Sequence, residues 1–251
     1  MSVVTPVLNG ARTLGATLDS VRAQTHRLVE HVVVDGGSTD GTLDLLRARP
    51  DVVWLTAADG GMYDALNRGF QRATGQVLAS LNADDRYASP DALGAAVAAL
   101  EAHPEADVVY GDFRYVDDDG RTLELVVAPP FDRARLRRTN FVPPHATFLR
   151  RALFHERGFR LDPALRYAGD WEWFLRMSEA GVSFRHVPVV FAEFRRHGGS
   201  LTATTGWRAK LAEWRRICAR HRVSFAGLVL NELVLAPIGR RRRSRAAAEG
   251  R

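Results

Sequence analysis

Short apolar runs alternate with segments of helical periodicity along the first third of the chain. Four runs, at residues 2–6, 31–34, 52–55 and 77–81, end in turn-forming or polar residues, which predicts short buried strands. In the segments between them, apolar residues recur at spacings of three and four, which predicts helices. This alternation indicates an α/β fold, a Rossmann-like layered α/β/α sandwich with a mostly parallel central sheet.

Acidic residues follow three of the four predicted strands. Asp35 ends the second strand, Asp59 follows the third, and Asp84 and Asp85 follow the fourth. In such sheets, ligands bind beyond the carboxyl ends of the strands. Two neighbouring carboxylates at a buried strand end are costly without a counter-charge, and Mg²⁺ or Mn²⁺, which take oxygen ligands, would supply it. The alternative is a solvated Asp-Asp turn that caps the next helix.

The glycine-rich loop at residues 36–42 is not a dinucleotide-binding fingerprint, because an acid precedes its glycines and Ser-Thr-Asp follows them. We interpret the loop as a turn and a helix N-cap supplied by Ser38, Thr39 or Asp40. The carboxylate of Asp35 is different. At a strand end it can accept a hydrogen bond from the imide N–H of a uracil or thymine, or from a ribose hydroxyl.

The second half of the chain has a different pattern. An alanine-rich helix is predicted at residues 89–103, and two β-rich runs at 107–115 and 122–127 flank Asp-Asp-Asp-Gly, which predicts a hairpin. The arginine-rich segment 129–139 either closes over a phosphate or forms a solvated loop. Residues 167–177 predict another helix.

The C-terminal part begins with a predicted strand at residues 187–193 and a flexible loop at 195–200. An amphipathic helix is expected at 207–221 and an apolar helix at 225–238, followed by an arginine cluster. An apolar helix beside basic residues can lie on an anionic membrane surface. Alternatively, it packs on the core and leaves a disordered basic tail at 240–251. No recognition motif accompanies the charge, so nucleic acid is not an expected partner.

Composition narrows the setting. The 251 residues carry a net charge of +6, and Lys210 is the only lysine. Arginine holds phosphate and carboxylate groups bidentately, although a GC-rich genome gives the same bias. The single cysteine, Cys218, excludes an intrachain disulfide and fits a reducing compartment. The first residues lead into a strand without a signal sequence, and no stretch is long and apolar enough to span a bilayer, so we expect a cytoplasmic protein.

Several motifs together resemble the family 2 glycosyltransferases, which adopt the GT-A fold. They are Thr-Pro-Val-Leu-Asn at 5–9, the Asp-Gly-Gly-Ser-Thr-Asp-Gly-Thr run at 35–42, Asp-Gly-Gly-Met-Tyr-Asp at 59–64, Asn-Ala-Asp-Asp at 82–85 and Gly-Asp-Trp-Glu at 169–172. They occur in the order found in the family. The resemblance implies a GT-A domain at 1–204, with a nucleotide-binding half at 1–88 and an acceptor half at 89–204. A helical extension at 205–239 follows.

The resemblance also implies roles for individual residues. Nucleotide contacts are expected from Thr5, Pro6, Asn9, Asp35, Asp59 and Asp84. The metal ligands are expected to be Asp85, as the principal one, and Asp84; the division of labour between them stays open, because the family's usual motif is Asp-x-Asp. Asn9 is alternatively a simple helix cap.

In the acceptor half, Asp170 matches the family's catalytic general base, whereas its position alone would favour a capping role at a helix start. Acceptor or diphosphate contacts are expected from His145, Glu172, Arg196 and His197. For His145 the alternative is a buried structural histidine, and for His197 it is a surface loop.

The sequence therefore predicts an inverting, metal-dependent glycosyltransferase. It would move a sugar from a UDP-, GDP- or dTDP-linked donor to a hydroxyl of a saccharide or lipid-linked acceptor, in polysaccharide or glycolipid synthesis. Peripheral membrane contact through the C-terminal helix and basic tail is a further expectation. Two alternatives stay open: a nucleotidyltransferase, which would release pyrophosphate, and a catalytically silent membrane-surface or scaffold protein.

Overall fold

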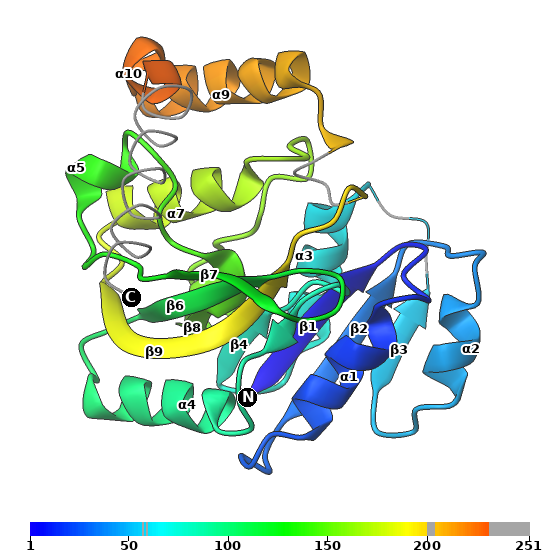
Figure 1. Ribbon diagram of the computed structural model, residues 1–251. Coiled ribbons are helices and arrows are strands. Elements are labelled where there is room, and N and C mark those ends of the chain that lie inside the picture. Colours follow the sequence, from blue (N-terminus) through cyan, green and yellow to red (C-terminus); the bar gives the residue numbers. More distant parts are fainter. Residues whose placement is uncertain (57, 59, 200–203, 231–251) are drawn as a thin grey trace, which may run out of the picture.

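A computed structural model describes residues 1–56, 58, 60–199 and 204–230 (Figure 1). The strands are β1 (Ser2–Val7), β2 (Glu30–Asp35), β3 (Val53–Thr56), β4 (Val77–Ser80), β5 (Arg86–Tyr87), β6 (Val108–Val116), β7 (Thr122–Val126), β8 (Thr147–Arg150) and β9 (Phe184–Arg195). The helices are α1 (Leu14–Arg22), α2 (Thr42–Arg47), α3 (Met62–Arg72), α4 (Ala92–Ala102), α5 (Arg133–Leu136), the 3₁₀ helix η1 (Pro144–Ala146), α6 (Ala152–His155), α7 (Gly169–Glu179), α9 (Trp207–His221) and α10 (Phe225–Leu230).

The described strands form one sheet in the order β3-β2-β1-β4-β8-β6-β9-β5, with β7 beside β6. β3, β2, β1 and β4 run parallel, as the sequence predicts. Val7 at the end of β1 pairs with Asp35, so the polar residues that follow these strands lie at one edge of the sheet. The register explains why acidic residues distant in sequence share that edge.

The other half of the sheet mixes directions. β8 is antiparallel to both β4 and β6, and β7 forms the predicted hairpin with β6. β9 runs parallel to β6 and also pairs antiparallel with β5, with Arg86 opposite Glu193. β9 is therefore longer than the predicted strand, and Arg195 belongs to it rather than to a loop. Figure 1 shows β9 curving around the end of the sheet.

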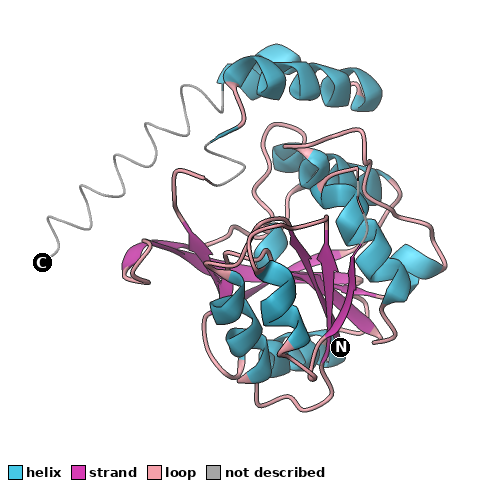
Figure 2. Ribbon diagram, turned by 90° about the vertical axis from the view of Figure 1, so that its right-hand side faces the viewer, coloured by secondary structure: helices cyan, strands magenta, loops and turns pink. Residues whose placement is uncertain are grey.

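Helices cover both faces of the sheet (Figure 2). On β1, Val4 packs into the cluster that contains α3, α6 and α7, while Val3 packs into the cluster that contains α4. α3 lies very close to the sheet, because a Cβ atom at Gly69 would come within 2.2 Å of the Val4 side chain. The predicted layered α/β/α arrangement is confirmed.

The C-terminal helix α9 is packed on this core. Trp214, Ile217 and Cys218 are buried in the same cluster as the residues of α7. Of the predicted apolar helix at 225–238, the structure describes Phe225–Leu230 as α10; the remainder and the basic tail lie outside the described residues. Among the described helices, none is long and apolar enough to cross a membrane.

Candidate active site

The loops after β1 and β2 are fastened to each other. The buried carboxylate of Asp35 accepts hydrogen bonds from the backbone N–H groups of Gly37 (3.0 Å) and Ser38 (3.1 Å). Asn9 has φ 53°, and its Oδ1 accepts from the N–H of Thr39 at 2.9 Å. Asn9 therefore bridges two loops rather than capping α1, whose N-cap is Thr13.

The cap of α2 differs from the prediction. Its N-cap is Gly41, with φ 94°, a conformation in which glycine avoids the strain that a side chain would cause. Asp40 contributes from the preceding position, since its Oδ1 accepts from the N–H of Thr42 at 3.1 Å. Ser38, by contrast, uses its hydroxyl to accept from the N–H of Asn9 at 2.7 Å. Ser38 therefore links the loops that follow β1 and β2, and Asp40 stabilises the first turn of α2.

Two of the expected nucleotide contacts, Thr5 and Pro6, are buried in β1. The Thr5 hydroxyl lies inside the sheet, 2.9 Å from Nε2 of His31. Burial lowers the pKa of His31 to about 4, so this pair is uncharged at neutral pH. Asp59 lies outside the described residues.

Asp84 and Asp85 have different environments. Asp85 is 1% exposed, and its carboxylate accepts from the backbone N–H of Arg195 (3.1 Å) and the amide of Asn82 (3.1 Å). Burial, and then the charge of Asp84, raise the pKa of Asp85 well above its ordinary value. The side chain of Asp84 is 25% exposed, and its Oδ2 lies 2.8 Å from Nε2 of His197. Asp84 is therefore the more accessible carboxylate.

These residues fit a divalent cation. Carboxylate oxygen and imidazole nitrogen are both ligands of divalent metals, and a cation beside Asp85 would offset the electrostatic cost that raises its pKa. Among the described residues, no three His, Cys, Asp or Glu side chains form a ready metal-binding group. The described residues that could contribute ligands are Asp84 and His197, whose side chains are in contact, while the neighbouring Asp85 is bonded to Asn82 and to the Arg195 N–H.

The arginines of the β9 segment point in different directions. Arg195 is buried, and its Nε donates to the carbonyl of Asp84 at 3.2 Å, while Nη1 donates to the carbonyl of Asp118 at 2.5 Å. Arg196 instead lies over the ring of Tyr115, 3.4 Å from its centroid, and pairs with Glu124. The structure brings His197 to the Asp84–Asp85 pair and leaves Arg196 on another surface.

Asp170 lies in the first turn of α7, partly buried between neutral groups. Its Oδ2 accepts from the amide of Asn140 at 2.9 Å, and its Oδ1 accepts from the hydroxyl of Tyr63 at 3.4 Å. Burial raises the pKa of Asp170 to about 6, although hydrogen bonds from the N–H of Trp171, its own N–H and these two side chains lower it in part. A carboxylate with such a pKa is suited to accept a proton near neutral pH.

The Glu172 side chain points into the protein, toward α9. Its carboxylate, fully buried, accepts hydrogen bonds from Arg176 (3.0 Å) and from Arg220 of α9 (3.1 Å), and lies 3.4 Å from His221. Burial alone would raise the pKa of Glu172, but the hydrogen bonds outweigh it and lower the pKa to about 2. The structure therefore places Glu172 in the contact between α7 and α9, away from the expected acceptor site.

His145 is also held inside the protein. Its ring lies edge-on to Phe113, with centroids 4.5 Å apart, and 5.1 Å from the ring of Phe194. Neither ring nitrogen has a hydrogen-bond partner in the described part of the chain, and burial lowers the pKa of His145 to about 3. This placement agrees with the alternative of a structural histidine.

Tyr63 and Asn140 are site residues that the sequence reasoning missed as individuals. Tyr63 belongs to the Asp-Gly-Gly-Met-Tyr-Asp motif at 59–64, in which the aspartates and glycines are the residues with recognisable chemistry. Asn140 follows the arginine-rich segment, where no periodicity or motif marks it. Tyr63 could have been found from its place in that motif; Asn140 could not.

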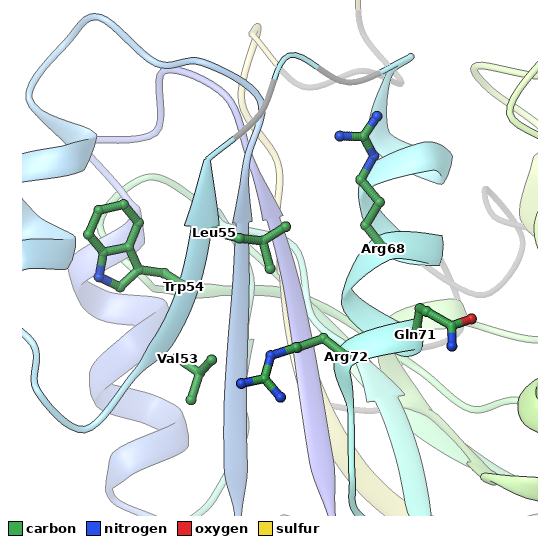
Figure 3. A pocket seen from close by; sticks show the side chains of 6 residues that line it. All are labelled: Val53, Trp54, Leu55, Arg68, Gln71 and Arg72. Atoms are coloured by element: carbon green, nitrogen blue, oxygen red, sulfur yellow. The ribbon is translucent and has the colours of Figure 1, made fainter.

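A separate pocket of about 390 Å³ lies at the outer edge of the sheet (Figure 3). Residues of β3 and α3 line it: Val53, Trp54, Leu55, Arg68, Gln71 and Arg72. Arg68 there is already paired with Asp64 at 2.9 Å. None of the predicted site residues contributes to this pocket.

Comparison with known proteins identifies the family to which the chain belongs. The model of the family described as "Glycosyl transferase family 2" matches residues 2–158. The chain belongs to this glycosyltransferase family. The resemblance drawn from the sequence motifs is confirmed, as is the enzyme class at the level of the family.

Curated relatives of this family 2 member occur in mycobacteria. A PGL/p-HBAD biosynthesis glycosyltransferase of Mycobacterium bovis is 36% identical over 204 residues, which cover 79% of this chain and 77% of the relative. An uncharacterized glycosyltransferase of Mycobacterium tuberculosis is 34% identical over 221 residues, covering 79% and 82%. The similarity thus extends beyond the segment that the family model matches.

Solved structures confirm the GT-A fold for this family 2 chain. Staphylococcus aureus TarS in complex with UDP-GlcNAc has a TM-score of 0.71 at 20% identity, covering 87% of this chain and 65% of that one. The mannosyltransferase PcManGT from Pyrobaculum calidifontis, in complex with GDP-Man and Mn²⁺, has a TM-score of 0.65 at 23% identity and covers 87% and 63%. The chain therefore spans just under two thirds of the length of these structures.

Proposed function

We propose that the protein transfers a sugar from a nucleotide-diphosphate donor to an acceptor hydroxyl with inversion at the anomeric carbon. The observation that carries this proposal is Asp170, a partly buried carboxylate with a pKa of about 6, held by the neutral side chains of Tyr63 and Asn140. The nucleotide-sugar complexes of the two structural neighbours support the donor class.

In this mechanism Asp170 accepts the proton of the acceptor hydroxyl as that oxygen attacks the anomeric carbon. The new glycosidic C–O bond forms on one face while the bond to the donor's diphosphate oxygen breaks on the other. The nucleoside diphosphate leaves with the bonding electrons. Tyr63 and Asn140 keep the carboxylate oriented by donating to its two oxygens.

The residues proposed to hold Mg²⁺ or Mn²⁺ are Asp84 and His197, with Asp85 behind them. When bound, the cation would offset the negative charge that develops on the leaving diphosphate. Arg195 holds the two aspartates in position, because its Nε donates to the carbonyl of Asp84 and its backbone N–H donates to the carboxylate of Asp85. The complex of PcManGT with GDP-Man and Mn²⁺ supports the use of a divalent metal in general.

We propose a saccharide or lipid-linked acceptor and a cytoplasmic enzyme with peripheral membrane contact. A biosynthetic role is supported by the mycobacterial relative, which is named for PGL/p-HBAD biosynthesis. The nucleotide pocket is proposed at the ends of β1 and β2, where Asn9 and Asp35 join the two loops. Asp59 is retained as a proposed nucleotide contact on the family resemblance alone.

Calorimetry with UDP, GDP and dTDP, with and without Mn²⁺, tests the donor site. We expect metal-dependent binding of one of them, lost in Asp84→Ala and retained in Asp170→Asn. Transfer assays with the matching nucleotide sugar should then show Asp170→Asn reduced at least about 100-fold. Release of pyrophosphate would support a nucleotidyltransferase, and absence of nucleotide binding by folded protein would support the silent scaffold.

A further inference from the structure

Glu213 of α9 reaches the segment that leads into Asp170. Its carboxylate accepts hydrogen bonds from three consecutive backbone N–H groups, those of Arg166 (2.7 Å), Tyr167 (2.9 Å) and Ala168 (3.0 Å). These residues end where α7 begins. A side chain that is 45 residues distant in sequence thus holds the start of the helix that carries the proposed base.

The next N–H groups along the chain turn to other acceptors. That of Gly169 donates to the hydroxyl of Tyr63 at 2.9 Å, and those of Asp170 and Trp171 face the Asp170 carboxylate. Six consecutive N–H groups are therefore divided among Glu213, Tyr63 and Asp170. The N-cap residue of α7, Ala168, supplies no side-chain cap of its own. The Glu213 carboxylate lies just before this helix start, on the N–H groups of residues 166–168, near the positive end of the helix dipole.

The helix that carries Glu213 is firmly attached. Trp214 beside it is buried in the main core and lies 6.3 Å from the ring of Tyr167. The Lys210 ammonium lies 4.6 Å from the centroid of the same ring. Tyr167 is thus held by its ring as well as by its N–H, so the position of α9 sets the position of the segment before Asp170.

We propose that Glu213 is a positioning residue for Asp170, so that α9, which lies beyond the part matched by the family model, completes the active site. The inference rests on the proposed function, because it takes Asp170 to be the base. Glu213 keeps three N–H dipoles directed at itself. Without Glu213 these N–H groups lose their acceptor, and the electrostatic potential at Asp170, at the N-terminal end of α7, becomes more positive. Both the orientation and the basicity of Asp170 then change.

Two variants test this. Glu213→Ala removes the acceptor, and Glu213→Gln removes the charge while keeping one acceptor oxygen. We expect kcat to fall about 10-fold or more in Glu213→Ala and less in Glu213→Gln, with an unchanged Kd for the donor nucleotide. The acid limb of the kcat profile should move to lower pH, because the Asp170 anion becomes more stable. Hydrogen exchange should be faster at residues 166–168, a readout that needs no activity.

Glu179→Gln is the matched control. Glu179 lies at the other end of α7 and bonds Arg137 (3.1 Å) and His221 of α9 (2.7 Å), so its loss loosens the same helix contact far from Asp170. We expect the Glu179→Gln protein to have a lower melting temperature and an unshifted profile of kcat against pH. If Glu213→Ala leaves kcat, pH profile and exchange unchanged while Asp170→Asn is inactive, the positioning role is wrong. If Asp170→Asn stays active, the proposed base fails, whatever Glu213 does.

Discussion

Asp170 lies where burial disfavours its ionised form and four hydrogen bonds favour it, and the balance leaves its pKa at about 6. A general base must be ionised to accept a proton, so the ionised fraction, and with it kcat, falls as the pH drops through about 6. Tyr63 contributes to this balance from α3. Its own hydroxyl has a pKa raised well above the ordinary value, by burial first and by the charge of Asp170 second, so it stays a donor.

Tyr63→Phe should therefore move the acid limb of the kcat profile to higher pH. The variant removes a donor to the Asp170 anion and so raises the pKa of the carboxyl, by up to about one unit. The ring itself is retained, which matters because it lies against α7 so closely that a Cβ at Gly169 would come within 2.5 Å of it. The measurement is kcat against pH for both proteins. An unmoved limb, with the fold intact, would show that Tyr63 does not influence the base.

His145 offers a second test at the scale of one side chain. Both its ring nitrogens are buried without a partner in the described residues, a situation that costs about 1–3 kcal/mol relative to a satisfied group. If the histidine is only structural, His145→Leu should keep or raise the melting temperature and leave kcat/KM unchanged. A variant of normal stability with a clearly reduced kcat/KM would instead support the acceptor or diphosphate contact implied by the family resemblance.

At the scale of elements, the sequence predicts those strands and helices that a local pattern determines, and it does not predict those that depend on long-range contacts. β1 to β4 were predictable because each is an apolar run of a few residues with a polar end. The full length of β9 was not predictable, since the residues that extend it beyond 187–193 include the charged or polar Arg185, His186 and Arg195. Its pairing with β5 also depends on residues more than one hundred positions away. The bond from Glu213 to residues 166–168 leaves no pattern in the sequence for the same reason.

The contact between α7 and α9 gives a prediction for Glu172. Its lowered pKa stabilises the fold above pH 4.5, and this contribution is lost as the pH falls toward 2. Glu172→Gln should reduce the free energy of unfolding at neutral pH by about 1–3 kcal/mol, less than for a fully buried pair because Arg176 and Arg220 remain partly exposed. Urea unfolding at pH 7 and pH 3 measures it.

The difference between the two proteins should shrink at the lower pH. Donor binding by Glu172→Gln should equal that of the natural chain, because the carboxylate faces α9. Weakened donor or acceptor binding with unchanged stability would restore Glu172 to the list of substrate contacts.

At the scale of the whole molecule, the net charge is unevenly distributed. The last twelve residues hold six arginines and one glutamate, and so account for +5 of the net charge of +6. The remainder of the chain, which contains the fold and the proposed site, is therefore close to neutral. Such a cluster is attracted to anionic lipid by about 1 kcal/mol for each basic residue near the surface, and salt weakens the attraction.

The full chain should accordingly bind vesicles that contain phosphatidylserine and not vesicles of phosphatidylcholine alone. A chain ending at residue 239 should lose this binding while it keeps its affinity for the donor nucleotide. Replacing the arginines at 240–245 by lysine is the matched control, because it preserves charge and should preserve binding. Cosedimentation at low and high salt measures all three proteins. If the truncated chain still binds the vesicles, the membrane contact lies in the helices and not in the basic tail. If the full chain does not bind them, the proposed membrane contact is wrong.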